Sequence, residues 1–179
     1  MPKHIALLRA VNVGGTGRVP MADLKAMFAR LGFDNAKTLL QSGNVVFDGG
    51  KHKPADLETL LERETEKKFK HRPDYVVRTS AEWKTLVAAN PFVREAKADP
   101  GRLVVLPFKK KPTGDIEALR AAIKGRETVE LLGRELYAYY PDGQGTSKLT
   151  GTLIEKHLGA RGTARNWNTV LKLAALCEE

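Results

Sequence analysis

The chain has 179 residues and is 42% apolar, which is enough for a hydrophobic core in one ordinary domain or two small ones. No apolar run approaches the roughly 18 to 20 residues that span a bilayer, and no secretory signal pattern is present, so we expect a cytoplasmic protein. The single cysteine, Cys177, fits a reducing compartment, and the net charge of +9 favours anionic partners in general without identifying nucleic acid.

The first part of the chain has the pattern of a small unit of mixed helices and strands. Pro20 suits the first turn of a helix, Gly32 ends that helix, and Ser42 and Gly43 form a tight hairpin turn. The expected elements, in chain order, are a strand at 3–9, a helix at 20–32, strands at 37–41 and 44–48, a helix at 54–69 and a strand at 75–77. This βαββαβ order is that of the ferredoxin-like α/β plait.

A connecting segment, residues 80–101, follows this unit. It starts with a helix, because Thr79-Ser80-Ala81-Glu82 has the form of a capping box, and that helix must end near Asn90-Pro91. Residues 93–102 show no apolar periodicity, so they are predicted to be a linker.

Beyond the linker the same pattern starts again. The expected elements are a strand at 103–108, a helix at 116–125, a hairpin of strands at 128–132 and 135–140 that turns at Gly133-Arg134, a helix that opens at Ser147-Lys148 and ends at Gly159, an extended stretch near Thr163 and a last helix from Trp167. The sequence therefore predicts an α+β protein with two ferredoxin-like subdomains, residues 1–79 and 102–179, the second with an extra C-terminal helix. We expect the two subdomains to share one polar cleft.

Four segments of the chain resemble one bacterial protein family. They are IALLR running into NVGG at residues 5–15, QSGNVVF at 41–47, YPDG running into SKL at 140–149 and TARNWNT at 163–169. With four motifs in the right order, the chain resembles the family known as domain of unknown function 1697 over essentially its whole length. Ala10 and Thr16 depart from the glycine and the basic residue that similar sequences often show. The resemblance implies a pair of ferredoxin-like subdomains and no activity.

The first two motifs hold candidate ligand-binding residues. The glycine loop after the first strand could bind a phosphate through backbone N–H groups, but it lacks the Gly-Lys-Ser/Thr ending of a P-loop and the spacing of a dinucleotide fingerprint. Turn geometry is the alternative explanation for these glycines and for the polar residues at the hairpin tip. The candidates are Arg9, Asn12, Gly14, Gly15, Gln41, Ser42 and Asn44.

The last two motifs add candidates of the same kind. Ser147 and Lys148 at a helix start could bind an anion, or Ser147 could simply cap the helix. A Ser–Lys nucleophile pair is disfavoured, because adjacent side chains on a helix point about 100° apart. Arg165 could hold an anion with two hydrogen bonds while Asn166 caps the final helix and Trp167 packs it on the core. The candidates are Ser147, Lys148, Arg165, Asn166, Trp167 and Asn168.

The favoured function is binding of, or catalysis on, a phosphorylated or otherwise anionic small molecule such as a nucleotide, with basic candidate residues holding the charge and Trp167 stacking. One alternative is a module for single-stranded nucleic acid, which would stack bases on the strand of Tyr137, Tyr139 and Tyr140. A second alternative is a scaffold for protein–protein contacts.

No cofactor, metal site or catalytic residue is predicted. The four histidines are scattered, without the spacing of metal ligands, and Cys177 has no His or Asp nearby in the sequence. Two local basic clusters, residues 67–72 and 109–111, add to the positive charge of the surface.

Overall fold

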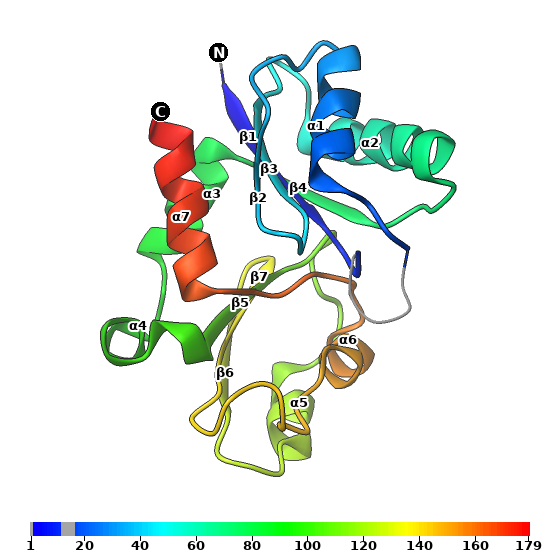
Figure 1. Ribbon diagram of the computed structural model, residues 1–179. Helices are drawn as coiled ribbons and strands as arrows, with labels where there is room; N and C mark the ends of the chain where they lie inside the picture. The colour runs from blue at the N-terminus through cyan, green and yellow to red at the C-terminus, as the bar shows by residue number, and fades with distance from the viewer. Residues whose placement is uncertain (1, 12–16) are drawn as a thin grey trace. The chain divides into compact units, whose positions relative to one another are not determined.

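Two sheets organise the chain. The computed structural model describes residues 2–11 and 17–179. Within these residues the chain forms two four-stranded antiparallel sheets and seven α-helices, so the protein is of the mixed α+β class (Figure 1). By its internal contacts the chain divides into a first unit, Met1–Thr85 with Leu173–Glu179, and a second unit, Leu86–Lys172.

The first unit contains the sheet with strand order β2-β3-β1-β4. Its elements are β1 (Lys3–Leu8), α1 (Met21–Arg30), β2 (Lys37–Leu39), β3 (Asn44–Asp48), α2 (Pro54–Phe69), β4 (Tyr75–Thr79) and the start of α3 (Ser80–Ala88). Strand β1 lies in the middle, antiparallel to β3 and β4, with Ile5 opposite Val46 and Arg78. Helices α1 and α2 cover one face of this sheet (Figure 1).

The core of the first unit forms because successive side chains of a strand point to opposite faces of the sheet. Ala6 and Leu8 of β1 face the helices and share one hydrophobic core with Phe28 of α1 and Leu57 of α2. The intervening Leu7 is also buried, so both faces of this central strand are closed to solvent.

The free edge of the first sheet, at β4, is covered by two glutamates of α2. Glu62 accepts a hydrogen bond from the backbone N–H of Tyr75 at 2.9 Å, and Glu58 accepts one from Val77 at 3.0 Å. The two glutamates lie one helical turn apart, so they match alternate residues of the strand, and both are buried. The carboxylates therefore occupy two N–H groups that an edge strand would otherwise offer to another chain.

The second unit contains the sheet with strand order β6-β7-β5-β8. Its elements after α3 are α4 (Val93–Ala98), a 3₁₀ turn (Pro100–Arg102), β5 (Leu103–Pro107), α5 (Ile116–Ala122), β6 (Thr128–Leu132), β7 (Glu135–Tyr139), α6 (Gly151–Leu158), β8 (Arg165–Asn166) and α7 (Trp167–Glu178), whose last residues belong to the first unit. Residues of α5 and α6 share a hydrophobic core with β5, β6 and β7. No helix within the described ranges is both long and apolar enough to cross a membrane.

Several sequence predictions are confirmed by the elements and others need correction. The capping box is present, since Thr79 N donates to Glu82 at 2.8 Å and Glu82 N donates to Thr79 Oγ1 at 3.1 Å. Residues 93–102, for which no regular element was predicted, contain α4 and a 3₁₀ turn. None of the residues of α4 is buried, so this helix has no apolar periodicity to reveal it.

The start of α6 also differs from the prediction. The helix begins at Gly151 and is capped by Thr150, whose hydroxyl accepts a hydrogen bond from Leu153 N at 3.2 Å. Ser147 lies in the loop before it, where its hydroxyl accepts a hydrogen bond from Leu149 N at 3.0 Å. Ser147 and Thr150 are both residue types that cap helices, and in the structure Thr150 is the cap of α6.

Candidate functional site

In the first unit, the structure brings the first two motifs together at one end of the sheet. Leu8, at the end of β1, donates its N–H to the carbonyl of Gly43 in the turn between β2 and β3, at 2.9 Å. Gly43 has a φ of 88°, and a Cβ at this position would lie 2.8 Å from Leu8 Cβ. Only glycine satisfies both conditions, so the turn geometry itself explains why this motif contains Gly43.

The polar residues of that turn differ in what they can offer a ligand. Asn44 is fully buried, and its Nδ2 donates to Leu39 O at 2.6 Å and to Ser42 Oγ at 3.1 Å. Its amide therefore closes the turn from inside. Gln41 is the exposed member of the group.

Arg9 follows β1 and is held beside the start of β4. Its backbone N–H donates to Asp74 O at 2.9 Å, and its guanidinium lies 3.9 Å from the Asp74 carboxylate. The side chain is one third exposed, at 34%. The other candidates of this loop, Asn12, Gly14 and Gly15, lie outside the described residues, as does Thr16.

His71 lies beside Gly17, the first residue described after position 16. Gly17 packs directly against its ring, since a Cβ on Gly17 would come within 2.4 Å of ring carbons. The ring nitrogen Nε2 is buried and has no hydrogen-bond partner among the described residues. A histidine was not a candidate here, because in the sequence His71 is only one member of a basic run.

Ala10 has a left-handed backbone with a φ of 54°, at the position where similar sequences often carry glycine. An L-residue in this region is destabilised by about 1–2 kcal/mol, so we expect Ala10→Gly to raise the free energy of unfolding by about 1 kcal/mol. Ala26→Gly, on the exposed face of α1, is the matched control and should lower it by about 1 kcal/mol. Urea unfolding of the three proteins measures both values. An Ala10→Gly protein that is less stable than the wild type would show that the backbone at Ala10 is not strained.

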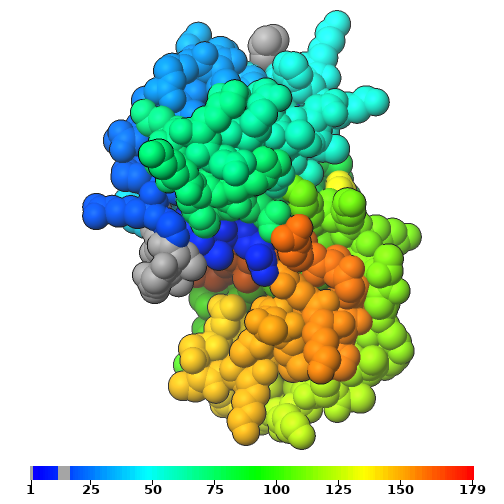
Figure 2. All heavy atoms as spheres, turned by 90° about the vertical axis from the view of Figure 1, so that its right-hand side faces the viewer, coloured from blue at the N-terminus to red at the C-terminus, as the bar shows by residue number. Residues whose placement is uncertain are grey.

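In the second unit, the structure gathers the third motif around one hollow, here called the Ser147 hollow. Its volume is about 270 Å³. It is lined by Lys124, Gly125, Glu127, Asp142, Gly143, Thr146, Ser147 and Lys148. The segments that form it, including the loop before α6, lie at the surface of the unit, in yellow and orange (Figure 2).

The charged side chains that line the Ser147 hollow differ in whether they have a partner. Asp142 is paired with Arg126, which donates to it through two nitrogens, and this pairing lowers the pKa of the Asp142 carboxyl. Glu127 accepts a hydrogen bond from the Ser147 hydroxyl at 2.6 Å. Lys124 and Lys148 are exposed, and within the described part of the chain neither has an acidic partner. The hollow therefore offers two ammonium groups that have no direct acidic partner in the described residues, beside one carboxylate, that of Asp142, whose charge Arg126 neutralises.

In the fourth motif, Arg165 is buried to a degree that the sequence did not indicate. Arg165 is only 6% exposed, and its Nη1 donates to Thr163 Oγ1 at 2.7 Å and to Ala164 O at 2.8 Å. Burial lowers the pKa of its guanidinium to about 10, because the charged form is removed from water. Trp167 is 5% exposed, and Asn166 Oδ1 accepts a hydrogen bond from Thr169 N at 3.0 Å, as a helix cap does. Asn168 is exposed.

The tyrosines of β7 and its continuation do not form the stacking platform that the sequence suggested. Tyr137 is 1% exposed and donates its hydroxyl to Leu86 O at 2.5 Å, and Tyr140 is equally buried and donates to Leu149 O at 3.0 Å. Burial raises the pKa of both phenols, that of Tyr140 to about 12. Only Tyr139 is partly exposed, so two of the three rings are closed to bases.

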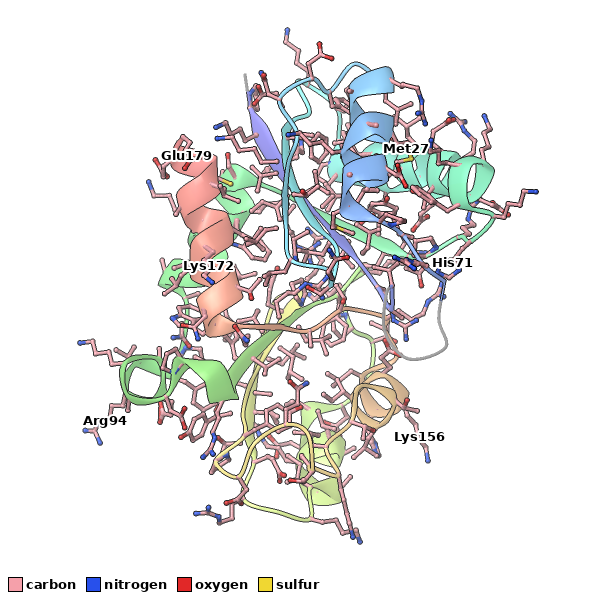
Figure 3. The ribbon with its side chains drawn as sticks, viewed as in Figure 1. Met27, His71, Arg94, Lys156, Lys172 and Glu179 are labelled. Carbon is pink, nitrogen blue, oxygen red and sulfur yellow. The ribbon has the colours of Figure 1, made fainter. Side chains whose placement is uncertain are left out.

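A larger hollow, which the sequence did not predict, lies in the first unit beside the end of α7. Its volume is about 480 Å³, and its charged lining consists of three lysines and three carboxylates. Glu179, at the end of α7 (Figure 3), is paired there with Lys37, and Asn35 donates to Asp48 at 2.9 Å. The charges of this hollow balance. In the described part of the chain, no group of three or more His, Cys, Asp or Glu residues is placed to hold a metal ion.

Comparisons with known proteins give the family and the fold. A solved structure of a conserved bacterial protein from Streptococcus pneumoniae is similar to this chain, with a TM-score of 0.72 at 19% sequence identity over 98% of each chain. A comparison with curated proteins finds no match. The model of the family described as "Protein of unknown function (DUF1697)" matches residues 1–137, and this match ends before the last two motifs. The chain therefore belongs to the DUF1697 family, whose function is not established.

Proposed function

We propose that the protein binds a phosphorylated or otherwise anionic small molecule in the Ser147 hollow. The observation that carries the proposal is the pair of exposed ammonium groups, Lys124 and Lys148, in a hollow where Arg126 neutralises Asp142 and Glu127 is hydrogen-bonded to Ser147. A phosphate oxygen would give both lysines a charge-assisted hydrogen bond. The sequence alone had suggested Ser147 and Lys148, and the hollow adds Lys124 to them.

The arrangement of Ser147 fits binding better than nucleophilic catalysis. Its hydroxyl donates to Glu127 and accepts from Leu149 N, so its proton and a lone pair are both engaged. Within the described residues, Lys148 has no hydrogen bond that would make it a base for Ser147. We therefore assign the hollow a binding role and no covalent step.

We interpret each unit as a ferredoxin-like plait. The strand orders β2-β3-β1-β4 and β6-β7-β5-β8, each with two helices at the connections, support this interpretation. The subdomain limits 1–79 and 102–179 remain our proposal. Plaits that bind single-stranded nucleic acid use exposed aromatic residues of the sheet, and the burial of Tyr137 and Tyr140 makes this alternative the weaker one.

Lys148→Ala tests the proposal. We expect inorganic phosphate and adenosine monophosphate to bind the wild type and to bind Lys148→Ala about 10-fold more weakly, which corresponds to one charge-assisted hydrogen bond of about 1.4 kcal/mol. Isothermal titration calorimetry measures both affinities. Lys124→Ala should have a similar effect, because it removes the second ammonium group of the same hollow.

The matched control is Lys156→Ala. Lys156 is an exposed lysine of α6 that does not line the hollow (Figure 3). The Lys156→Ala variant loses the same positive charge, so its affinities for phosphate and adenosine monophosphate should stay within about 2-fold of those of the wild type. Equal losses in Lys148→Ala and Lys156→Ala would mean that only the net charge attracts the anion, and the proposed site would then be wrong.

A further inference from the structure

We infer that the second unit carries a further anion site, independent of the Ser147 hollow, which takes a multivalent phosphate such as pyrophosphate. The site, here called the Arg161 hollow, has a volume of about 420 Å³. It is lined by Lys109, Lys110, Glu155, Gly159, Ala160 and Arg161. Two of these residues belong to the basic cluster at 109–111, which the proposed function does not use.

The backbone brings the cations of the Arg161 hollow together from two distant parts of the sequence. Phe108 and Gly162 form an antiparallel bridge beside β5, and next to it Lys109 N donates to Arg161 O at 2.8 Å. A Cβ on Gly162 would lie 2.4 Å from Pro107 O, so glycine is needed for this close approach of the two segments. The backbones of Lys109 and Arg161 are therefore held side by side by main-chain contacts.

The charge of the lining favours an anion. Three cationic side chains face one carboxylate, that of Glu155, which accepts a hydrogen bond from Gly162 N at 3.3 Å. Lys110 is exposed and has no acidic partner in the described ranges. Guanidinium and ammonium groups together suit a ligand with several phosphate oxygens, because arginine binds two oxygens in one plane and lysine acts as a point charge.

The end of α6 lies next to this hollow, and its carbonyl groups would repel an anion if they were free. They are occupied. Leu158 O accepts from Thr113 N at 3.0 Å and from Gly114 N at 2.9 Å, and Glu155 O accepts from Gly159 N at 2.8 Å. Gly159, with a φ of 65°, ends the helix in the left-handed conformation that makes this capping pattern.

The chemistry of the lining also limits the class of ligand that the Arg161 hollow can bind. None of the six lining residues is aromatic or has a large apolar side chain, so the hollow offers a nucleobase no surface for stacking. The groups that it does offer recognise phosphate. A compact multivalent phosphate matches them better than a nucleoside does.

Lys110 and Lys111 provide the test, because they are adjacent exposed lysines and only Lys110 lines the hollow. Pyrophosphate is titrated by calorimetry into full-length protein that carries Lys124→Ala and Lys148→Ala, so that the Ser147 hollow does not contribute. We expect Lys110→Ala to weaken binding about 10-fold and Lys111→Ala by less than about 2-fold. Arg161→Ala should weaken it more than Lys110→Ala does, because a bidentate contact is lost.

Three results would overturn the inference. The first is no pyrophosphate binding to the Lys124→Ala, Lys148→Ala background at low salt, which would leave the Ser147 hollow as the one anion site. The second is an equal loss in Lys110→Ala and Lys111→Ala, which indicates non-specific attraction. The third is tighter binding of orthophosphate than of pyrophosphate. Because the background lacks both lysines of the Ser147 hollow, failure of the proposed function alone leaves these results unchanged.

Discussion

Replacing both Glu58 and Glu62 with alanine is expected to lower the free energy of unfolding by about 4 kcal/mol. Each substitution leaves a buried backbone N–H of β4, that of Val77 or of Tyr75, without its acceptor, at about 2 kcal/mol for each group. The helix propensity of alanine recovers only a few tenths of a kcal/mol. Urea unfolding followed by circular dichroism measures the difference.

The loss should also appear as self-association. With both carboxylates removed, β4 presents two free N–H groups at the edge of a sheet, which is a template for pairing with another chain. Light scattering of the double variant should therefore rise with protein concentration below its unfolding temperature.

Two other variants separate this explanation from a simple loss of charge. Glu58→Gln with Glu62→Gln keeps a carbonyl acceptor at each position, so its stability should lie much closer to the wild type than that of the alanine variant. Glu66→Ala removes a carboxylate from the same helix, where it forms an exposed ion pair with Arg72, and should change stability by less than about 0.5 kcal/mol. If the glutamine variant is as unstable as the alanine variant, the carboxylates do not act as acceptors for the sheet edge.

The sequence predicts the elements of this fold well where periodicity and capping chemistry agree. The first unit has a continuous apolar run in β1, typical of a strand buried on both faces, and a clear three-and-four spacing in α1, and both elements occur where they are expected. Helix α4 was missed because it is exposed on all sides, and the start of α6 was misplaced because Ser147 and Thr150 are both good caps. Capping chemistry alone therefore does not determine where a helix begins, and a helix without a buried face leaves no apolar periodicity in the sequence.

The candidate site was less accessible to sequence reasoning. Ser147 and Lys148 were found through their motif, but Lys124 comes from another part of the chain and only the fold brings it to the same hollow. Glu58 and Glu62 look like ordinary surface residues of a charged helix, and their role depends on an edge strand that α2 covers. The cleft that we expected both subdomains to share stays a prediction.

Arg165 shows most clearly what the sequence could not predict. Its motif suggests a residue that binds an anion, whereas its burial indicates a structural role. Its guanidinium is fixed by Thr163 Oγ1 and Ala164 O, in the strand that pairs Arg165 with Val105 of β5. A side chain held in this way is expected to contribute to stability whether or not a ligand is present.

We therefore expect Arg165→Ala to lower the free energy of unfolding by about 3 kcal/mol, because it leaves a cavity and two acceptors without their donor. Arg165→Met fills a similar volume but still leaves the two acceptors without a donor, so it should lose less than Arg165→Ala, about 2 kcal/mol. Arg94→Ala, an exposed arginine of α4, is the control for loss of a positive charge and should stay within about 0.5 kcal/mol of the wild type. Urea unfolding ranks the variants, and the phosphate affinity of Arg165→Met by calorimetry should equal that of the wild type. An Arg165→Ala protein that unfolds like the wild type but no longer binds phosphate would reverse this assignment, because it would show that Arg165 holds the anion.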